Sequence, residues 1–236
     1  MSRKFKLHKR YYGEEYDLYK KGTITIEKGV TILVGCNGSG KTTLLRQIKD
    51  SLEKENIPVL HFDNLNDGGS KAVASASFYN DFAYMATAMQ SSEGENIILN
   101  IGKLASTIRP FIKTGKSQTE RDRFQRGLAE ALYGKKEEEN EISNERWILL
   151  DAVDSGLSVD NIVDLKGLFD AIFEDNPDND IYIVVSANEY ELCRGEHCFD
   201  VYNGKYVSFA DYEAYRSFIL ESRETKNKRQ EAFGNK

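Results

Sequence analysis

Long apolar runs are missing from this 236-residue chain, and cysteine, proline and tryptophan are scarce. No apolar stretch approaches the roughly 18 residues that a bilayer-spanning helix needs, so we expect no membrane insertion. The basic residues near the start are not followed by the apolar segment of a signal peptide. Three cysteines are too few, and odd in number, for a disulfide framework. These absences predict a cytoplasmic protein.

Positive charge is not in excess either. The chain has 32 Lys and Arg residues against 38 Asp and Glu residues, which gives a formal net charge of -6. Bulk charge therefore does not favour nucleic-acid binding, and any contact with DNA would need a local patch. Hydrophobic residues make up 40% of the chain, enough for a core, and the length suits one large α/β domain. We expect a single domain over residues 1–236.

Strand-like and helix-like segments alternate along the chain, which predicts an α/β fold with a mainly parallel central sheet. Short apolar segments typical of buried strands occur at 30–34, 58–62, 147–151 and 181–185. Amphipathic helices are predicted at 42–52, 161–173 and 211–224, the last followed by a polar tail. Antiparallel strands are predicted at 5–7 and 22–27, and a hairpin with an Asn-Gly turn at 199–209.

Residues 71–145 are expected to form a helical subdomain. Residues 71–112 have a mostly helical pattern with a break near 91–95, and 113–145 are predicted to be a charged insertion. The acidic run Glu137–Glu139 is best explained as a solvated loop. Basic residues in this subdomain make a candidate DNA-facing patch, although a solvated helical face is the simpler interpretation. They are Lys103, Arg109, Lys113, Lys116, Arg121, Arg123 and Arg126.

The most specific motif is Gly35-Cys36-Asn37-Gly38-Ser39-Gly40-Lys41-Thr42, which follows an apolar strand and precedes a helix. Its glycines let backbone N–H groups converge on an anion, and the helix N-terminus adds its dipole. Lys41 reaches the β- and γ-phosphates, and the Thr42 hydroxyl is offered to magnesium. The motif predicts binding of a nucleoside triphosphate with Mg²⁺.

The second motif is an acidic residue at the end of a predicted strand. Asp151 follows the apolar residues 147–150, which places its carboxylate at the carboxyl end of the sheet, where ligands bind in open α/β folds. We expect Asp151 to hold the magnesium, through water. By contrast, Cys193, His197 and Cys198 do not have the usual spacing of a tetrahedral zinc site.

Three segments resemble motifs of ATP-binding-cassette (ABC) ATPases. Residues 35–45, including Thr43, are similar to the Walker A form G-x-N-G-x-G-K-[ST]-T-L. Residues 91–95 are similar to the L-S-G-G-[QE] signature, and 149–158 to the joined Walker B and D-loop. The resemblance covers nearly the whole chain. It implies an ABC-type P-loop NTPase of the soluble, non-transporter branch, with an N-terminal antiparallel β subdomain and a helical subdomain.

The resemblance also implies a mode of action. Two copies would form a homodimer around two ATP molecules, with Mg²⁺, across a two-fold interface. Ser92 and Gly94 of one subunit would contact the γ-phosphate held by the P-loop of the other. Tyr11 or Tyr12 would stack on the adenine, as an upstream aromatic residue does in this family, or would be an ordinary core or surface tyrosine.

The catalytic part departs from the family pattern at Ala152, the position of the catalytic glutamate. Alanine cannot orient or deprotonate the attacking water, and loss of a general base costs about 10²–10⁴-fold in rate. Ala152 is either the natural residue or a replacement of glutamate that traps ATP. Asp154 is the nearest other carboxylate, but it aligns with a position that is not catalytic.

The polar residues that sense the γ-phosphate also differ. Asn188 or Ser186 stands near the switch-histidine position; both can form hydrogen bonds, but neither carries a positive charge. The Q-loop glutamine has no clear counterpart, and Asn64 and Asn66 are its candidates.

The sequence therefore predicts an ATPase that binds ATP well, hydrolyses it slowly and switches a partner or a nucleic-acid process. DNA repair, chromosome maintenance and phage defence are the candidate processes, with DNA and a nuclease or other effector protein as candidate partners. Two alternatives stay open. The chain could be the ATP-binding subunit of a membrane transporter, or a purely regulatory module that senses ATP.

Overall fold

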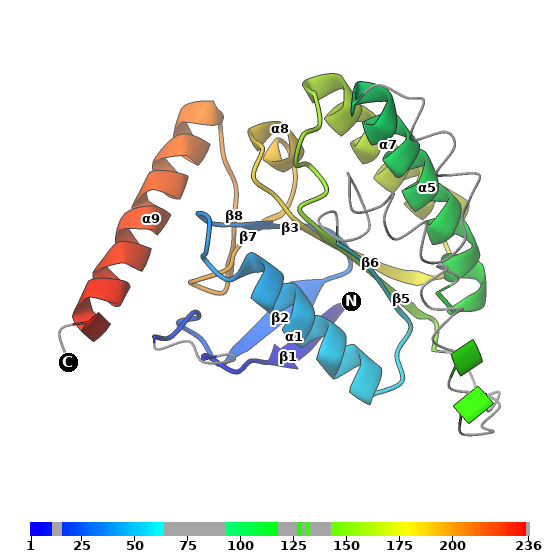
Figure 1. The fold of residues 1–236 in the computed structure, drawn as a ribbon, viewed down its shortest axis with the longest axis horizontal. Helices are drawn as coiled ribbons and strands as arrows, with labels where there is room; N and C mark the ends of the chain where they lie inside the picture. The colour runs from blue at the N-terminus through cyan, green and yellow to red at the C-terminus, as the bar shows by residue number, and fades with distance from the viewer. Residues whose placement is uncertain (11–15, 64–92, 118–126, 129–130, 133–142, 235–236) are drawn as a thin grey trace.

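The structure is a computed structural model that describes residues 1–10, 16–63, 93–117, 127–128, 131–132 and 143–234. Its described strands form two sheets (Figure 1). Strands β1 (Ser2–Lys6) and β2 (Thr23–Glu27) pair antiparallel. The second sheet has six strands in the order β4-β5-β6-β3-β7-β8. Its strands are β3 (Gly29–Val34), β4 (Val59–Asp63), β5 (Glu145–Asp151), β6 (Asp180–Ser186), β7 (Cys198–Asp200) and β8 (Lys205–Val207).

All neighbours in the larger sheet run parallel except β7 and β8, which form the predicted hairpin. The described helices are α1 (Lys41–Lys54), α5 (Glu93–Thr114), α7 (Val159–Asp175), α8 (Tyr190–Cys193) and α9 (Tyr212–Gly234). Figure 1 shows α1 and the β1–β2 pair on one face of the larger sheet, and α5 and α7 on the other. The predicted α/β fold with a mainly parallel sheet is confirmed.

The two faces of the sheet carry two separate apolar clusters because side chains alternate along each strand. In β3, Ile32 and Val34 join the cluster beneath α5, α7 and α8, whereas Leu33 joins the cluster beneath α1. In β6, Ile183 and Val184 divide in the same way. Both faces are covered, which explains why these strands are apolar without interruption.

Trp147 lies at the centre of the cluster beneath α1. Its ring stacks on Tyr182 with centroids 4.1 Å apart and meets Phe5 edge-on at 5.2 Å. Such aromatic pairs add about 0.5–1.5 kcal/mol each beyond the area that they bury. The contact with Phe5 fixes β1 against the parallel sheet.

Helix α5 packs its second half onto the main core. Leu104, Ile108 and Phe111 are buried in the cluster shared with α7, and the buried Arg146 donates from Nε to the Ile112 carbonyl at 2.7 Å. Residues 64–92 precede this helix and lie outside the described residues, so the predicted break near 91–95 stays a prediction. Residues 71–92 and most of 113–145 lie outside the described residues, so the helical subdomain stays a prediction.

The last helix is longer than its periodicity predicts. We expected a helix over 211–224 with a polar tail, but α9 continues to Gly234. The polar residues beyond 224 have partners: Lys226 Nζ donates to the Asn37 carbonyl at 2.9 Å, and Arg229 donates to the Asp17 carbonyl at 2.6 Å. The Arg229 guanidinium carbon also lies 3.9 Å from the Tyr202 ring centroid. The predicted tail is wrong because these contacts hold the helix against distant segments.

Candidate functional site

The predicted P-loop connects the end of β3 to the start of α1, and two of its glycines are required by geometry. Gly35 has φ 153° and Gly40 has φ 99°. A Cβ atom at Gly35 would lie 2.6 Å from Ser39 Oγ, and one at Gly40 would lie 3.2 Å from the Tyr19 ring. A side chain at either position would therefore deform the loop.

The start of α1 has the features of an anion site. Gly40 is its N-cap residue, and no side chain that the structure describes caps the helix. The first N–H groups of a helix have no partner within the helix, so they are available to an anion. The Ser39 hydroxyl is buried and has no hydrogen-bond partner among the described residues. A phosphate group would satisfy these donors, and the loop therefore fits the triphosphate that its sequence predicts.

Lys41 is held inside the loop. Its side chain is buried, and Nζ donates to the Gly35 carbonyl at 2.8 Å. Burial lowers the pKa of Lys41, while the nearby Cys36 thiol and the carboxylates of Asp154 and Asp151 act in the opposite direction. A bound phosphate would add negative charge beside this ammonium and stabilise its charged form.

Asp151 ends β5 at the same edge of the sheet as the P-loop, with β6 lying between β5 and β3. Its Oδ1 accepts a hydrogen bond from Ser186 Oγ at 2.6 Å, and Ser186 Oγ accepts from the Ala152 N–H at 2.8 Å. Ser186 therefore orients the carboxylate, and its hydroxyl proton is used in this hydrogen bond. Asp151 and the exposed Thr42 are the residues that would hold Mg²⁺.

Mg²⁺ is usually bound by only one or two protein side chains, because it keeps several waters and binds substrate phosphates. The described residues contain no group of three or more His, Cys, Asp or Glu side chains that could hold a metal by themselves. Cys193 and Cys198 are buried, and the Cys198 thiol donates to the Cys193 carbonyl at 3.5 Å.

Ala152, at the position where the resemblance places a glutamate, has an unusual backbone. Ala152 has φ 52°, in the left-handed region that a residue with a Cβ atom rarely adopts. Its methyl group offers no proton acceptor, so the residue after Asp151 cannot serve as a general base.

Asp154 does not replace that base, because its carboxylate is part of the core. The side chain is fully buried, and Oδ2 accepts from the Asn188 N–H at 2.6 Å and the Glu189 N–H at 2.8 Å. Burial raises the pKa of Asp154, and the two backbone hydrogen bonds oppose that shift. Asp154 thus joins the turn after β5 to the loop after β6.

Asn188, the switch-position candidate, follows β6 and is exposed. Its carbonyl accepts from the Tyr215 hydroxyl at 2.8 Å, and its N–H is bound by Asp154. The backbone of this position is therefore fixed from both sides, and its side chain is at the surface beside the Asp151 edge.

Several predicted site residues cannot be placed. Tyr11, Tyr12, Ser92, Asn64 and Asn66 lie outside the described residues. Gly94 lies in the first turn of α5. Of the proposed basic patch, Arg121, Arg123 and Arg126 are outside the described residues, and the exposed Arg109 lies 3.7 Å from Asp175.

Three contacts of the P-loop were missed by the sequence analysis. The buried Tyr19 donates from its hydroxyl to the Gly40 carbonyl at 2.9 Å, whereas we had singled out Tyr11 and Tyr12 from the same tyrosine-rich stretch. Ser222 and Lys226 reach the loop from α9. No motif surrounds these two residues, so the sequence offered no signal for them.

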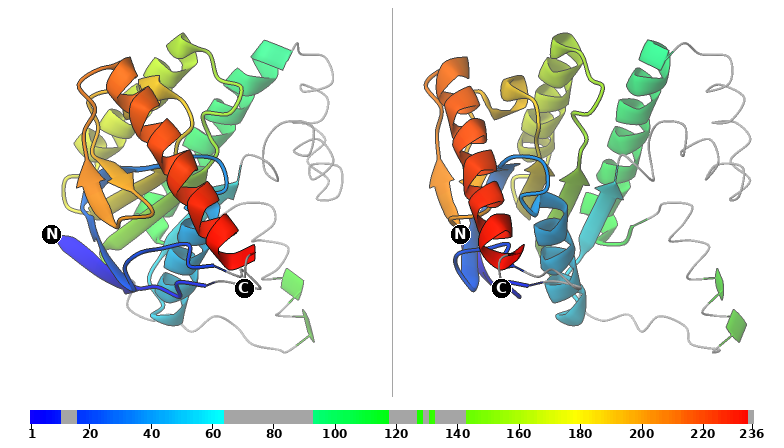
Figure 2. Two further views of the ribbon diagram at one scale, coloured as in Figure 1. Left: turned by 90° about the vertical axis from the view of Figure 1, so that its left-hand side faces the viewer. Right: turned by 60° about the vertical axis from the view of Figure 1, so that its left-hand side comes forward.

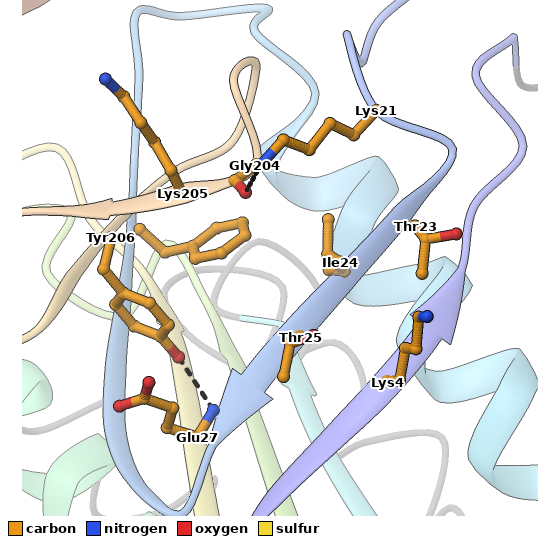
Figure 3. A pocket seen from close by; sticks show the side chains of 10 residues that line it. Lys4, Lys21, Thr23, Ile24, Thr25, Glu27, Gly204, Lys205 and Tyr206 are labelled. Carbon is orange, nitrogen blue, oxygen red and sulfur yellow. Dashed lines mark hydrogen bonds between the residues drawn. The ribbon is translucent and has the colours of Figure 1, made fainter.

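A surface hollow of about 490 Å³ lies away from the P-loop, between β2 and the β7–β8 hairpin (Figure 3). Lys21 Nζ donates to the Gly204 carbonyl at 3.0 Å, and the Glu27 N–H donates to the Tyr206 hydroxyl at 2.9 Å. These bonds join the small sheet to the large one. The hollow therefore lies at the junction of the two sheets, and we do not assign the nucleotide site to it.

One comparison with known protein families includes the P-loop. A family model described as an AAA domain matches residues 25–192. The chain is similar to the ADP conformation of MJ1267, an ATP-binding cassette of an ABC transporter, with 14% identity, coverage of 94% and 97% of the two chains and a TM-score of 0.43. It is also similar to Stu0660 of Streptococcus thermophilus, with 10% identity, coverage of 90% and 77% and a TM-score of 0.39.

No curated protein sequence matches the chain. Within the described part of the chain, no helix combines the length and apolar character needed to cross a membrane. The family match includes β3, the P-loop, α1 and the strand that ends at Asp151. The chain belongs to the AAA domain family of P-loop NTPases.

Proposed function

We propose that this chain binds Mg-ATP at its P-loop and hydrolyses it slowly, so that ATP binding rather than turnover is its main signal. The observation that carries the proposal is the start of α1, which no described side chain caps. It lies beside a buried Lys41 and a Ser39 hydroxyl that has no hydrogen-bond partner within the described part of the chain. Thr42 and Asp151 would hold the magnesium. The bound metal would neutralise charge on the phosphates, and Lys41 would hold the β- and γ-phosphates.

Slow hydrolysis is expected from the other half of the site. Ala152 has no group that can activate water, and the carboxylate of Asp154 is buried and bound to two backbone N–H groups. Without a general base the rate falls by about 10²–10⁴-fold. Typical enzymes turn over about 10 times per second, so we expect a rate on the order of 0.1 per second or less.

Resemblance to the ABC motifs supports a further step, in which ATP joins two copies of the chain. The segment around Ser92 and Gly94 of one copy would meet the γ-phosphate held by the other, at the start of α5. A long-lived ATP complex would then keep the dimer closed and switch a partner. A purely regulatory, ATP-sensing module is the second candidate, and Ala152 is the observation that favours it.

Calorimetric titration with Mg-ATP tests the binding step. The wild-type chain should release or absorb heat with one site per chain, and Lys41→Met should weaken binding by at least about 100-fold, the loss of roughly 2.7 kcal/mol. Lys49→Met is the matched control, since Lys49 lies on α1 and pairs with Glu53 at 2.9 Å. Absence of binding by the wild type would overturn the proposal.

Light scattering during size-exclusion chromatography tests the dimer. Mass should double with Mg-ATP and stay that of one chain with Lys41→Met. Phosphate release measured in the same samples should stay slow. A wild-type turnover of several per second would contradict the slow-hydrolysis part of the proposal.

A further inference from the structure

Helix α9 lies against the outside of the P-loop, although it comes from the far end of the chain. Both views in Figure 2 show it beside the start of α1. Two of its side chains bond to the loop backbone: Ser222 Oγ accepts from the Cys36 N–H at 3.1 Å, and Lys226 Nζ donates to the Asn37 carbonyl at 2.9 Å. Side chains of α9 therefore contact the backbone of the predicted phosphate-binding loop.

The Ser222 contact fixes one peptide unit of the loop. The C=O and N–H groups of a trans peptide point in opposite directions. The Cys36 N–H belongs to the same peptide unit as the Gly35 carbonyl, which accepts from Lys41 Nζ at 2.8 Å. Because Ser222 holds the N–H end, the carbonyl end is turned towards Lys41. Ser222 thereby sets where the Lys41 ammonium rests.

The Lys226 contact fixes a second peptide unit of the loop, the one between Asn37 and Gly38. The Asn37 carbonyl and the Gly38 N–H share a peptide unit, so holding the carbonyl outward turns the N–H to the opposite side. Gly38 has φ 74°, and a Cβ atom placed there would lie 3.3 Å from Lys226 Nζ. The ammonium thus sits over Gly38, on the side of the loop that faces α9.

Arg229 keeps α9 in this position. Its guanidinium donates to the carbonyl of Asp17 at 2.6 Å and packs over the Tyr202 ring at 3.9 Å. Asp17 precedes Leu18 and Tyr19, and Tyr19 bonds to Gly40 at the end of the P-loop. The loop is therefore held at its start by α9 and at its end by Tyr19.

We propose that Ser222 and Lys226 are positioning residues for the nucleotide site, which orient two peptide units of the P-loop from α9. The inference rests on the proposed binding of Mg-ATP. Its chemical consequence is preorganisation: the loop N–H groups and Lys41 are aligned before the phosphates arrive, so less of the binding free energy is lost in ordering them. Removing either contact should weaken nucleotide binding without removing any group that touches the nucleotide.

Calorimetric titration of the full chain with Mg-ADP, which is not hydrolysed, tests this role. Ser222→Ala and Lys226→Met should each raise the dissociation constant by about tenfold, the usual size for one hydrogen bond. Ser222→Thr and Lys226→Arg retain the acceptor and the donor and should restore most of the affinity. Ser217→Ala and Lys228→Met, at exposed positions of the same helix, should leave it unchanged.

Amide NMR signals supply a readout that does not depend on nucleotide. Loss of the Ser222 acceptor should shift the Cys36 amide proton upfield, and Lys226→Met should shift the Gly38 amide, while Ser217→Ala should move neither. Thermal unfolding of all six variants identifies any general loss of stability. If Ser222→Ala or Lys226→Met melts at a lower temperature than the wild type, the role of that residue is judged from Ser222→Thr or Lys226→Arg instead.

The outcomes separate the two proposals. If the wild type binds Mg-ADP and both Ser222→Ala and Lys226→Met bind as tightly as the controls, the positioning role is wrong and the proposed function stands. If the wild type binds no nucleotide, the proposed function is wrong. In that case unshifted Cys36 and Gly38 amides in the variants would also overturn the orienting contacts from α9.

Discussion

The two halves of the site, at one edge of the same sheet, are built in opposite ways. The P-loop half is assembled from glycines, helix N–H groups and a buried lysine, and it is supported from outside by Tyr19 and α9. The half after β5 and β6 has Asp151, the carboxylate that we propose for Mg²⁺, but has alanine where the resemblance places a base. Its remaining carboxylate, Asp154, is used by the core.

This contrast teaches that binding and hydrolysis make separable demands on a P-loop protein. Binding needs oriented backbone donors, which a loop and a helix start can provide. Hydrolysis also needs a group to activate water, and that group is most often a positioned side chain. Substitutions in the second half should therefore change rate, metal dependence and stability, and leave the phosphate-binding loop as it is.

The largest effect should come from restoring the base. Ala152→Glu is expected to raise ATP turnover by about 10²–10⁴-fold, because it returns a carboxylate to the position after Asp151. Steady-state phosphate release with excess Mg-ATP measures the change. Ala152→Gln has the same size without the basic oxygen pair and should stay slow. Equal rates for Ala152→Glu and the wild type would mean that something other than the missing base limits hydrolysis.

Next in size is the effect of removing the Asp154 carboxylate. Asp154→Ala leaves the N–H groups of Asn188 and Glu189 without their acceptor, which should cost about 2–4 kcal/mol of unfolding free energy in total. Asp154→Asn retains an acceptor oxygen and should stay within about 1 kcal/mol of the wild type. Urea unfolding measures both. A small loss for Asp154→Ala would contradict the connecting role that we assign to this side chain.

A comparison of the wild type with Asp154→Asn at different pH values gives a second test. Burial raises the pKa of Asp154 in the folded state above the ordinary aspartate value of 3.8, so the folded state favours the protonated acid. The stability contributed by this group is full below about pH 4 and is lost as the pH rises through the raised folded pKa. Asp154→Asn lacks that loss. Its stability relative to the wild type should increase as the pH rises above about 4, and a constant difference would contradict the shift.

A smaller effect is expected at Ser186. Ser186→Ala removes the hydrogen bond to Asp151, and loss of such a supporting contact weakens metal binding by about 10- to 100-fold; we expect the lower figure. Nucleotide affinity measured with Mg²⁺ should fall about tenfold, while affinity measured in EDTA should not change. A loss of equal size in both conditions would place the effect on the P-loop instead.

The smallest effect concerns the backbone at Ala152. Replacement by glycine should stabilise the fold by about 0.5–1 kcal/mol, because φ 52° is strained for a residue with a Cβ atom. Asn56 has φ 54°, and Asn56→Gly should gain less since asparagine tolerates this region. Ala171→Gly, in the helical α7, should lose about 1 kcal/mol. Thermal or urea unfolding of the three variants ranks them.

Most of the fold was predictable because its signals are local. The strands that end at Val34, Asp151 and Ser186 are short apolar runs, and the helix after Lys41 has clear periodicity. The P-loop was predicted for the same reason: its eight residues carry both the glycines and the lysine. The length of α9 was not, because a polar helical segment is stabilised by partners that the sequence does not place beside it.

The sequence by itself determined the sheet, the phosphate loop and the absence of a base after Asp151, since each depends on neighbouring residues or on one side chain. Only the tertiary structure decided that Asp154 belongs to the core and that Ser222 and Lys226 reach the loop. Those contacts join residues 34, 186 and 189 positions apart. No periodicity or motif extends over such separations; packing of the completed sheet and helices brings the partners together.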